Sequence, residues 1–529
     1  MPTAPTPPNT PPDPRRWWAL TAVVLSVLVI SFDLTILNVA LPTMATELHA
    51  STSQQQWIID SYTVVFAAAM LPAGLLGDRF GRRRMLTVGL ALFGTASLLG
   101  MLADSPGTVI AARAVMGVGG ALIMPLSMAV VPGLFPVKEQ GRAIGALASA
   151  LAAGMPLGPL VGGLLLNHFW WGSVFLVNLP LVAIGIIACV LLIPESRDPA
   201  APRIDLVATV LAAGGLGSLT YGIIEGPTRG WSDGLVVATL GAAVAGLTVL
   251  VLRSLRQRRP MLDLSLLRDR GYRWSALAAT LVSVMVFGGF FVLPLYFQAV
   301  LGTDAFGTGL RLMPMMGGLL VASRITDRLL VRLGARTLIT AGLALVAAAL
   351  LLGSRTGTGD GYGFAACWLP LLGLGMGLSI IPAMGAALAT LTPERAGVGS
   401  GLLQTLRQVG GAIGVAAFGS LLAGAYTARL DTTGLPAAAA RTARDSVAAA
   451  DAVAQQLHDL ALTASAHAAY VHAMDRVLLV AGVVAVVSAV LVGARMPGRA
   501  AAAPVTPAPG GPEAAPLAAM GGDRGESSV

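Results

Sequence analysis

The sequence predicts an all-helical membrane protein of fourteen spanning helices. Of its 529 residues, 55% are hydrophobic and only 11% are charged, and the mean hydropathy is +0.77. Soluble domains carry about 25% charged residues, so most of this chain must face lipid. A spanning helix needs ~20 mostly apolar residues. The chain contains fourteen such runs: 17–41, 54–77, 85–103, 107–131, 142–166, 173–194, 204–225, 235–252, 274–300, 309–331, 337–353, 363–391, 399–425 and 476–494.

Basic residues are distributed unevenly between alternate connecting segments. Fourteen spans put both termini on one side, and most of the 34 Lys and Arg residues then fall on that side. Cytoplasmic segments carry such an excess, so we expect both termini in the cytoplasm. Seven of these residues lie between the eighth and ninth runs: Arg253, Arg256, Arg258, Arg259, Arg268, Arg270 and Arg273. Membrane orientation therefore accounts for the pI of 10.1, and no nucleic-acid partner is predicted.

The two ends and one connection differ from the apolar runs. Residues 1–16 are rich in Pro and Thr, and residues 495–529 in Ala, Pro and Gly, so we expect disordered cytoplasmic tails. The segment 426–475 should be the largest extracellular loop and form helical pieces on the surface. Its histidines, His458, His467 and His472, are expected to be solvated rather than bound to metal. No cofactor is predicted.

The first run contains an acid where lipid-facing sequence should have none. Residues 31–42 read S-F-D-L-T-I-L-N-V-A-L-P and include Asp33 and Asn38. An acid inside a span costs ~2.5–3.5 kcal/mol on insertion scales, so it should face the bundle interior and serve a function. The segment resembles the signature of the fourteen-helix drug:proton antiporters. That resemblance implies proton coupling or substrate binding. A permanent ion pair that docks two helices is the alternative.

The second run carries an acid at each end. Asp60 and Asp78 are eighteen residues apart, or five helical turns, so they share one face ~27 Å apart. Asp60 should lie in the outer half of the span. In the resembling exporters, an acid at this position serves cation recognition or proton exchange. A plain helix-end acid is the alternative.

The segment that follows, 74–86, reads G-L-L-G-D-R-F-G-R-R-R-M-L. Five charges in so short a connection between apolar runs indicate a mechanical role. The matching positions resemble the G-x-x-x-D-R-x-G-R-R pattern of the major facilitator superfamily, which implies a conformational switch on the cytoplasmic side. These positions are Gly74, Asp78, Arg79, Gly81, Arg82 and Arg83.

The fourth run contains Arg113, in the segment R-A-V-M-G-V-G-G-A. It is similar to the family pattern R-x-x-Q-G-x-G-x-A, with Met116 in place of the usual glutamine. Arginine does not deprotonate, so it needs an acid or several carbonyl groups nearby. The first span runs outward and the fourth inward, which places Asp33 and Arg113 in the same half of the membrane. We therefore expect the two to meet, although a guanidinium bonded only to backbone is an alternative.

The fifth run reads G-M-P-L-G-P-L-V-G-G over residues 154–163. Glycines at four-residue spacing let another helix approach closely, and we expect that helix to come from the second half of the chain. Prolines remove backbone donors and bend the helix. The segment resembles the G-x-x-x-G-P-x-x-G-G pattern of exporters in the superfamily and favours efflux over uptake. Its marked positions are Gly154, Pro156, Gly158, Pro159, Gly162 and Gly163.

A faint internal repeat relates the two parts of the chain. Residues 81–92 and 334–345 share seven of twelve positions, and Val331 stands where the first copy has Asp78. Transporters often contain two related halves around a site near the middle of the membrane. We expect an N-terminal six-helix half at 17–194, two inserted helices at 204–252, and a C-terminal six-helix half at 274–494.

Together these features predict a proton-coupled exporter of amphipathic drugs or antibiotics. It should act as a monomer in a bacterial plasma membrane, with protons and lipid as its further partners. No nucleophile, metal or phosphate motif supports an enzyme. Two alternatives remain, a proton-coupled uptake permease for a small metabolite and a non-transporting membrane receptor.

Overall fold

The computed structural model describes residues 16–135, 137–197, 205–257, 263–391 and 393–497. The expected disordered tails therefore lie almost entirely outside the described residues. Within them the chain is helical. The elements are α1 (Arg16–Glu47), α2 (Thr52–Phe80), α3 (Arg82–Met101), α4 (Pro106–Leu134), α5 (Val137–His168), α6 (Ser173–Leu176), α7 (Asn178–Leu192), α8 (Leu206–Arg229), α9 (Gly234–Arg256), η1 (Leu264–Arg268), α10 (Arg270–Leu295), η2 (Tyr296–Val300), α11 (Ala305–Gly353), α12 (Tyr362–Ala389), α13 (Pro393–Arg429), α14 (Ala437–Asp445), α15 (Val447–Leu457) and α16 (Leu460–Arg495).

Twelve of the described helical segments are long and apolar enough to cross a membrane. A thirteenth is α2, which passes the same test as a pair bent by 52° between Met70 and Pro72. Helix α11 holds two of these segments, Ala305–Thr326 and Arg328–Gly353, and its backbone is non-helical at Gly334, where φ is 77°. The expected all-helical, many-span architecture is confirmed.

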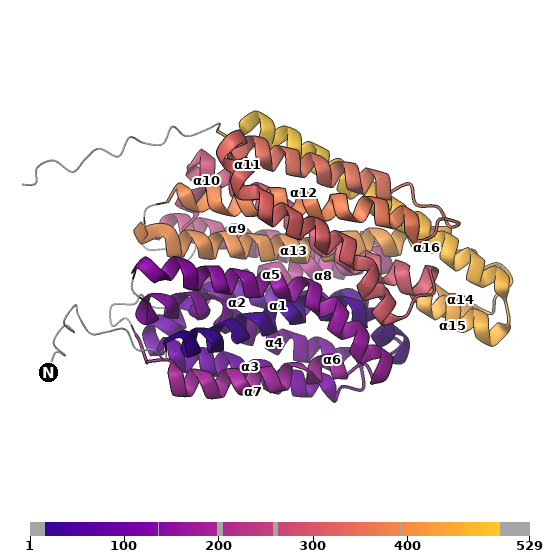
Figure 1. The fold of residues 1–529 in the computed structure, drawn as a ribbon. Coiled ribbons are helices and arrows are strands. Elements are labelled where there is room, and N and C mark those ends of the chain that lie inside the picture. The colour runs from indigo at the N-terminus through magenta and orange to yellow at the C-terminus, as the bar shows by residue number, and fades with distance from the viewer. Residues whose placement is uncertain (1–15, 136, 198–204, 258–262, 392, 498–529) are drawn as a thin grey trace, which may run out of the picture.

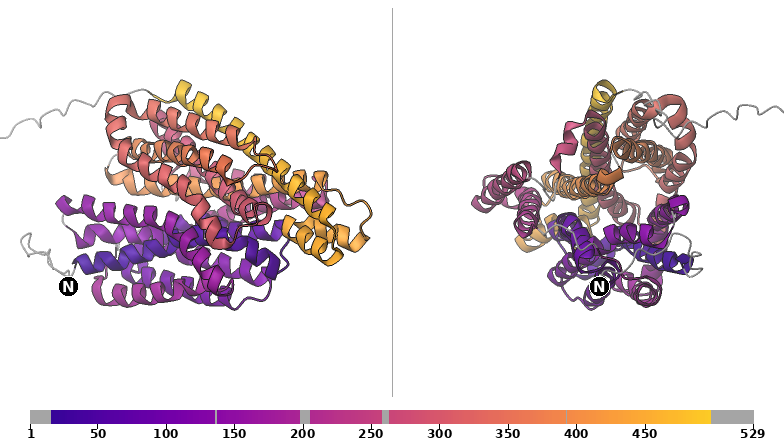
Figure 2. Two further views of the ribbon diagram at one scale, coloured as in Figure 1. Left: turned by 45° about the vertical axis from the view of Figure 1, so that its right-hand side comes forward. Right: turned by 90° about the vertical axis from the view of Figure 1, so that its left-hand side faces the viewer.

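The long helices run side by side in two groups (Figures 1 and 2). Helices α1 to α7 lie together, and α10 to α13 pack with α16. Between these groups in the sequence, α8 and α9 form a hairpin at the periphery, most clearly in the end-on view (Figure 2, right). Helix α8 packs against both α2 and α13, so the hairpin contacts both groups.

Local chemistry sets the helix ends. Ser51 and Gln54 form a capping box at the start of α2, and each satisfies a backbone N–H of the other. Asp205 caps α8 and also accepts hydrogen bonds from Arg253 and Gln257 at the end of α9. These bonds, chiefly the one from Arg253, lower the pKa of Asp205 to about 2. An ion pair between Asp205 and Arg253 therefore links the start of α8 to the end of α9.

The segment 426–475 is more ordered than a surface loop. It holds α14, α15 and the first turns of α16, which begins at Leu460, well before the predicted span of 476–494. Tyr426 donates to the carbonyl of Ala443 at 3.0 Å, and His467 lies 3.1 Å from the Asp451 carboxylate. The expected helical pieces are confirmed, but they pack together and onto the bundle.

Polar contacts join the two groups at the end that carries α14 and α15. Gln298 donates to the Val39 carbonyl at 2.9 Å, and Thr52 donates to the Asp445 carbonyl at 2.6 Å. Asn167 of α5 donates to Asp304, the N-cap of α11. That bond is the main reason why the pKa of Asp304 lies below its usual value. These contacts hold the two groups of helices together at this end.

Candidate functional site

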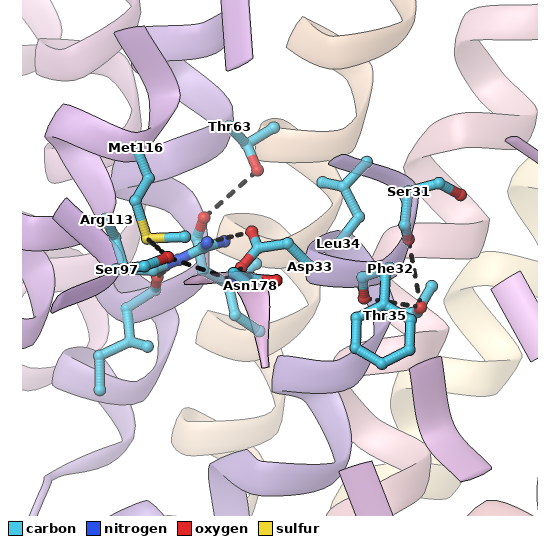
Figure 3. Close-up of polar contacts among 12 residues, drawn as sticks. Ser31, Phe32, Asp33, Leu34, Thr35, Thr63, Ser97, Arg113, Met116 and Asn178 are labelled. Atoms are coloured by element: carbon cyan, nitrogen blue, oxygen red, sulfur yellow. Dashed lines mark hydrogen bonds and ion pairs between the residues drawn. The ribbon is translucent and has the colours of Figure 1, made fainter. Parts of the chain in front are cut away.

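A buried ion pair lies between α1 and α4 (Figure 3). Arg113 donates through a terminal nitrogen to the Asp33 carboxylate, and the two side chains are 2% and 1% exposed. The sequence prediction that these residues meet is confirmed. A buried pair is stable only when its remaining donors and acceptors are also satisfied.

Neighbouring side chains supply further hydrogen bonds to the Asp33 carboxylate and around it. Asn178, at the start of α7, donates to the second Asp33 oxygen at 3.3 Å and also lies 3.2 Å from the Ser97 hydroxyl. Ser97 in turn lies 3.9 Å from the sulfur of Met116. Helices α1, α3, α4 and α7 thus meet at one network. Sequence reasoning missed Asn178 as a site residue. An amide inside the apolar run 173–194 was the available signal.

Helix α2 supplies the other contacts of Arg113. Its Nε donates to the Ile58 carbonyl at 3.2 Å, and its guanidinium carbon lies 4.3 Å from the centroid of the Tyr62 ring. A cation over an aromatic face gains about 0.5–2 kcal/mol, the larger value when desolvated. The guanidinium is therefore held by an acid, a carbonyl and an aromatic ring at once.

Asp60 lies on α2, two residues from both Ile58 and Tyr62, yet it takes no part in the network. Its side chain is 0% exposed, and neither carboxylate oxygen has a hydrogen-bond partner among the described residues. A buried charge without a partner is costly, so a proton or a bound cation is needed at this position. The structure brings Asp33 and Arg113 together and leaves Asp60 unpaired.

Asn38, the fourth predicted coupling residue, also stands apart. It is 6% exposed and donates at 2.9 Å to the carbonyl of Leu34, one turn earlier in α1. That bond is internal to the helix and connects Asn38 to neither acid.

The predicted switch segment forms the turn from α2 to α3. Gly81 has a φ of 110°, a conformation that favours glycine, and a Cβ there would lie 2.5 Å from Glu195. Asp78 accepts a hydrogen bond from Arg82 at 2.9 Å, and Arg82 also donates to the Ala129 carbonyl of α4 at 3.0 Å. Of the other predicted positions, Arg79 is exposed, Gly74 is half-buried, and Arg83 lies 3.7 Å from Glu195. These contacts all lie within the first group of helices.

The internal repeat has a structural counterpart. Gly334 has positive φ like Gly81, so both copies begin with the same sharp turn. Gly89 and Gly342 then pack closely on a glycine of the next helix. The Gly89 carbonyl lies 2.8 Å from a Cβ built at Gly119, and the Gly342 carbonyl lies 2.7 Å from one built at Gly375. In both groups, therefore, the aligned glycines form a sharp turn and then a close contact with the next helix.

The glycine motif of α5 faces a different helix from the one expected. A Cβ at Gly154 would lie 3.0 Å from the backbone nitrogen of Phe32, and one at Gly158 would lie 2.9 Å from that of Ile36. Gly162 likewise packs on Ile36. The prediction that this stripe packs against the second half is wrong, because α1 occupies it.

The adjacent edge of α5 does reach the other group. Gly163 packs on the backbone of Ala305 and Phe306, and the Pro159 carbonyl lies 2.6 Å from a Cβ built at Gly309. Helix α5 is thus sandwiched between α1 and α11. The side chain of Pro156 lies outside the described residues.

The contacts of this ion pair depend on the charge of Asp33. Protonation of Asp33 would remove the charge that holds Arg113, while Tyr62, Ile58 and Asn178 keep their places. Asp60 offers a second acid, whose carboxylate oxygens have no hydrogen-bond partner among the described residues. Across the described residues, no group of three or more His, Cys, Asp or Glu side chains could hold a metal ion.

Two groups of long apolar helices, with a buried ion pair inside the first group, define the class as a polytopic membrane protein. The chain belongs to the Major Facilitator Superfamily, whose sequence model matches residues 23–415. Its fold is similar to that of a bacterial homolog of the human lysosomal transporter Spinster in an inward-facing, unoccupied conformation. The TM-score is 0.65 at 16% identity, over 91% of this chain and 98% of that one.

Curated relatives extend over most of the chain. It is 36% identical to a puromycin resistance protein of Streptomyces alboniger, over 81% of this chain and 86% of the relative. It is 32% identical to a multidrug efflux pump of Mycolicibacterium smegmatis, over 92% of this chain and 98% of the relative. The resemblance drawn from the sequence motifs is confirmed at this level.

Proposed function

We propose that this protein exports amphipathic drugs or antibiotics across a bacterial plasma membrane in exchange for protons. The observation that carries the proposal is the buried Asp33–Arg113 pair, whose acid sits among fixed polar partners inside a span. The activities for which the relatives are named, antibiotic resistance and multidrug efflux, support the direction of transport.

The cycle follows from the contacts of that pair. With Asp33 ionised, Arg113 ties α4 to α1. A proton arriving on Asp33 weakens this tie, and the guanidinium is left with the Ile58 carbonyl and the Tyr62 ring, both on α2. Proton binding on α1 therefore changes the forces between α1, α2 and α4. Asp60 serves as the second acid, for a proton or a cationic group of the cargo.

The architecture is proposed to contain fourteen spans. Thirteen of them are the apolar segments described above, and the fourteenth is α5, a helix of 32 residues. Residues 17–194 then form the N-terminal half, 204–252 the two inserted helices, and 274–494 the C-terminal half. The matching Gly81 and Gly334 turns support two related halves. Both termini lie in the cytoplasm, where the basic residues gather, and the protein acts as a monomer.

A resistance assay tests the proposal. Bacteria that express the chain are grown against a panel of antibiotics, beside the same host without the chain and a strain that expresses the Asp33→Asn variant. Export predicts raised inhibitory concentrations for some compounds, lost in the variant and in the presence of a proton uncoupler. If the strain that expresses the wild-type chain is as sensitive to every antibiotic as the host without it, export is contradicted. Resistance that survives the uncoupler would contradict proton coupling.

A further inference from the structure

A second arginine inside an apolar segment, Arg407, has no acid beside it among the described residues. It lies on α13 within the apolar segment Gly399–Arg429, eight residues or ~12 Å from the start of that segment. Its side chain is half-buried. One terminal nitrogen donates to the Gln404 side chain at 2.8 Å and approaches the Met384 sulfur of α12 at 3.5 Å, and its buried Nε has no acceptor. No acid of the described residues lies within ion-pair distance of it.

The position of Arg407 points it into the protein rather than toward lipid. Gly410 and Gly414, three and seven residues later, lie on the same face of α13, since such spacings share a face. Both pack on α10, at the Thr280 and Val284 carbonyls. With α10 on that face and Met384 of α12 in contact, Arg407 sits between two neighbouring helices.

Asp60, the other unpaired charge, is not its partner. Gly419 of α13 packs on Gln56 of α2, and Ala412 packs beside Val64 further along, so the two helices run in opposite directions. Arg407 lies twelve residues from Gly419, and Asp60 lies four residues from Gln56. The two charges are thus separated by ~12 Å along the helices. That separation is too great for an ion pair and is about the length of a drug-sized molecule.

We propose that Arg407 binds an anionic group of the exported compound, a carboxylate or phenolate. This inference rests on the proposed export function and names the class of cargo. A guanidinium presents five N–H donors in a planar fork that matches a carboxylate. In Arg113 that capacity is used by Asp33. In Arg407 one terminal nitrogen contacts Gln404 and Met384, and the buried Nε has no acceptor among the described residues, so an arriving anion supplies the missing charge.

The test uses two dyes that differ in one carboxylate, rhodamine B and its ethyl ester. Their uptake into everted vesicles under a proton gradient is compared for wild type, Arg407→Gln and Arg407→Lys. Arg429→Gln, an exposed arginine at the end of the same helix, is the matched control. Binding to the purified protein is measured by dye fluorescence polarisation, and thermal unfolding checks the fold.

Arg407→Gln should weaken binding and uptake of rhodamine B by about tenfold, as expected for a lost hydrogen bond to a charged group, and change the ester by less than about twofold. Arg407→Lys keeps the charge without the fork and should lie between wild type and Arg407→Gln. Equal losses for both dyes, or no loss for either, would overturn the inference. If wild type binds rhodamine B through Arg407 but pumps neither dye, the export function fails while the anion site stands.

Discussion

Asp33 and Asp60 are two buried acids on neighbouring helices, and their surroundings are opposite. Asp33 accepts hydrogen bonds from Arg113 and Asn178, whereas Asp60 accepts none from the described residues. Both side chains are at most 1% exposed. The difference shows that burial alone does not define a role. Asp33 is compensated by its partners and links α1 to α4, whereas Asp60 has no partner among the described residues and, in the proposed function, takes a proton or a cation.

The largest effect is expected at Asp33. Asp33→Asn should abolish proton-driven exchange and also destabilise the fold, because it leaves Arg113 buried without its counter-charge, a change that typically costs ~3–5 kcal/mol. The double variant Asp33→Asn with Arg113→Met should recover stability but not exchange. Dye efflux in vesicles and thermal unfolding in detergent measure the two effects.

These measurements separate a role of Asp33 in proton-driven exchange from a role in holding α1 against α4. Wild-type exchange in Asp33→Asn vesicles would remove the coupling role and leave the pair as a helix clamp. If the double variant recovers both stability and exchange, the Asp33–Arg113 pair neither binds the exchanged proton nor responds to it.

The next effect is expected at Gly158, which touches the part of α1 that carries Asp33. Gly158→Leu would force a side chain against Thr35 and the Ile36 backbone, and overpacking typically costs ~1–3 kcal/mol. We expect lower thermal stability and slowed or leaky efflux, since α1 cannot keep its position. Gly217→Leu on α8, where a Cβ meets nothing within 4 Å, should change neither. Normal efflux and stability in Gly158→Leu would show that α1 and α5 can part freely.

Asp60 should behave in the opposite way to Asp33 in stability. Asp60→Asn replaces an acid that has no partner among the described residues by a neutral side chain of the same shape, so the unfolding temperature should stay the same or rise. Export of cationic compounds should fall by about tenfold, the effect of losing one charged contact. A fall in stability as large as that of Asp33→Asn would mean that Asp60 has a partner in the working protein.

The smallest effect on stability is expected at Asp78. Its bond to Arg82 is half-exposed, and such pairs contribute about 0–1 kcal/mol. The equivalent turn at Gly334 keeps its shape with Val331 in place of the acid, so the turn itself does not need the charge. Asp78→Ala should instead shift the population toward the inward-facing state, measured by cysteine labelling at both ends. Unchanged labelling would count against a switch role.

The sequence by itself determined the class of protein and most of the important positions. The apolar runs, the Asp33–Arg113 meeting and the short glycine-containing connection at 74–86 could all be read from it. These are local or nearly local properties, because span length, helical direction and glycine conformation depend on the residues of one segment and its place in the chain.

Only the tertiary structure decided which helices meet on each face. It placed α1 rather than the second half against the α5 glycines and brought Asn178 to Asp33, and within the described part of the chain it gave Asp60 and Arg407 no opposite charge. A helical repeat says which residues share a face, but not which neighbour covers it. In lipid, that neighbour is selected by close packing and by the pairing of polar groups across many helices at once. Neither quantity belongs to any single segment of the sequence.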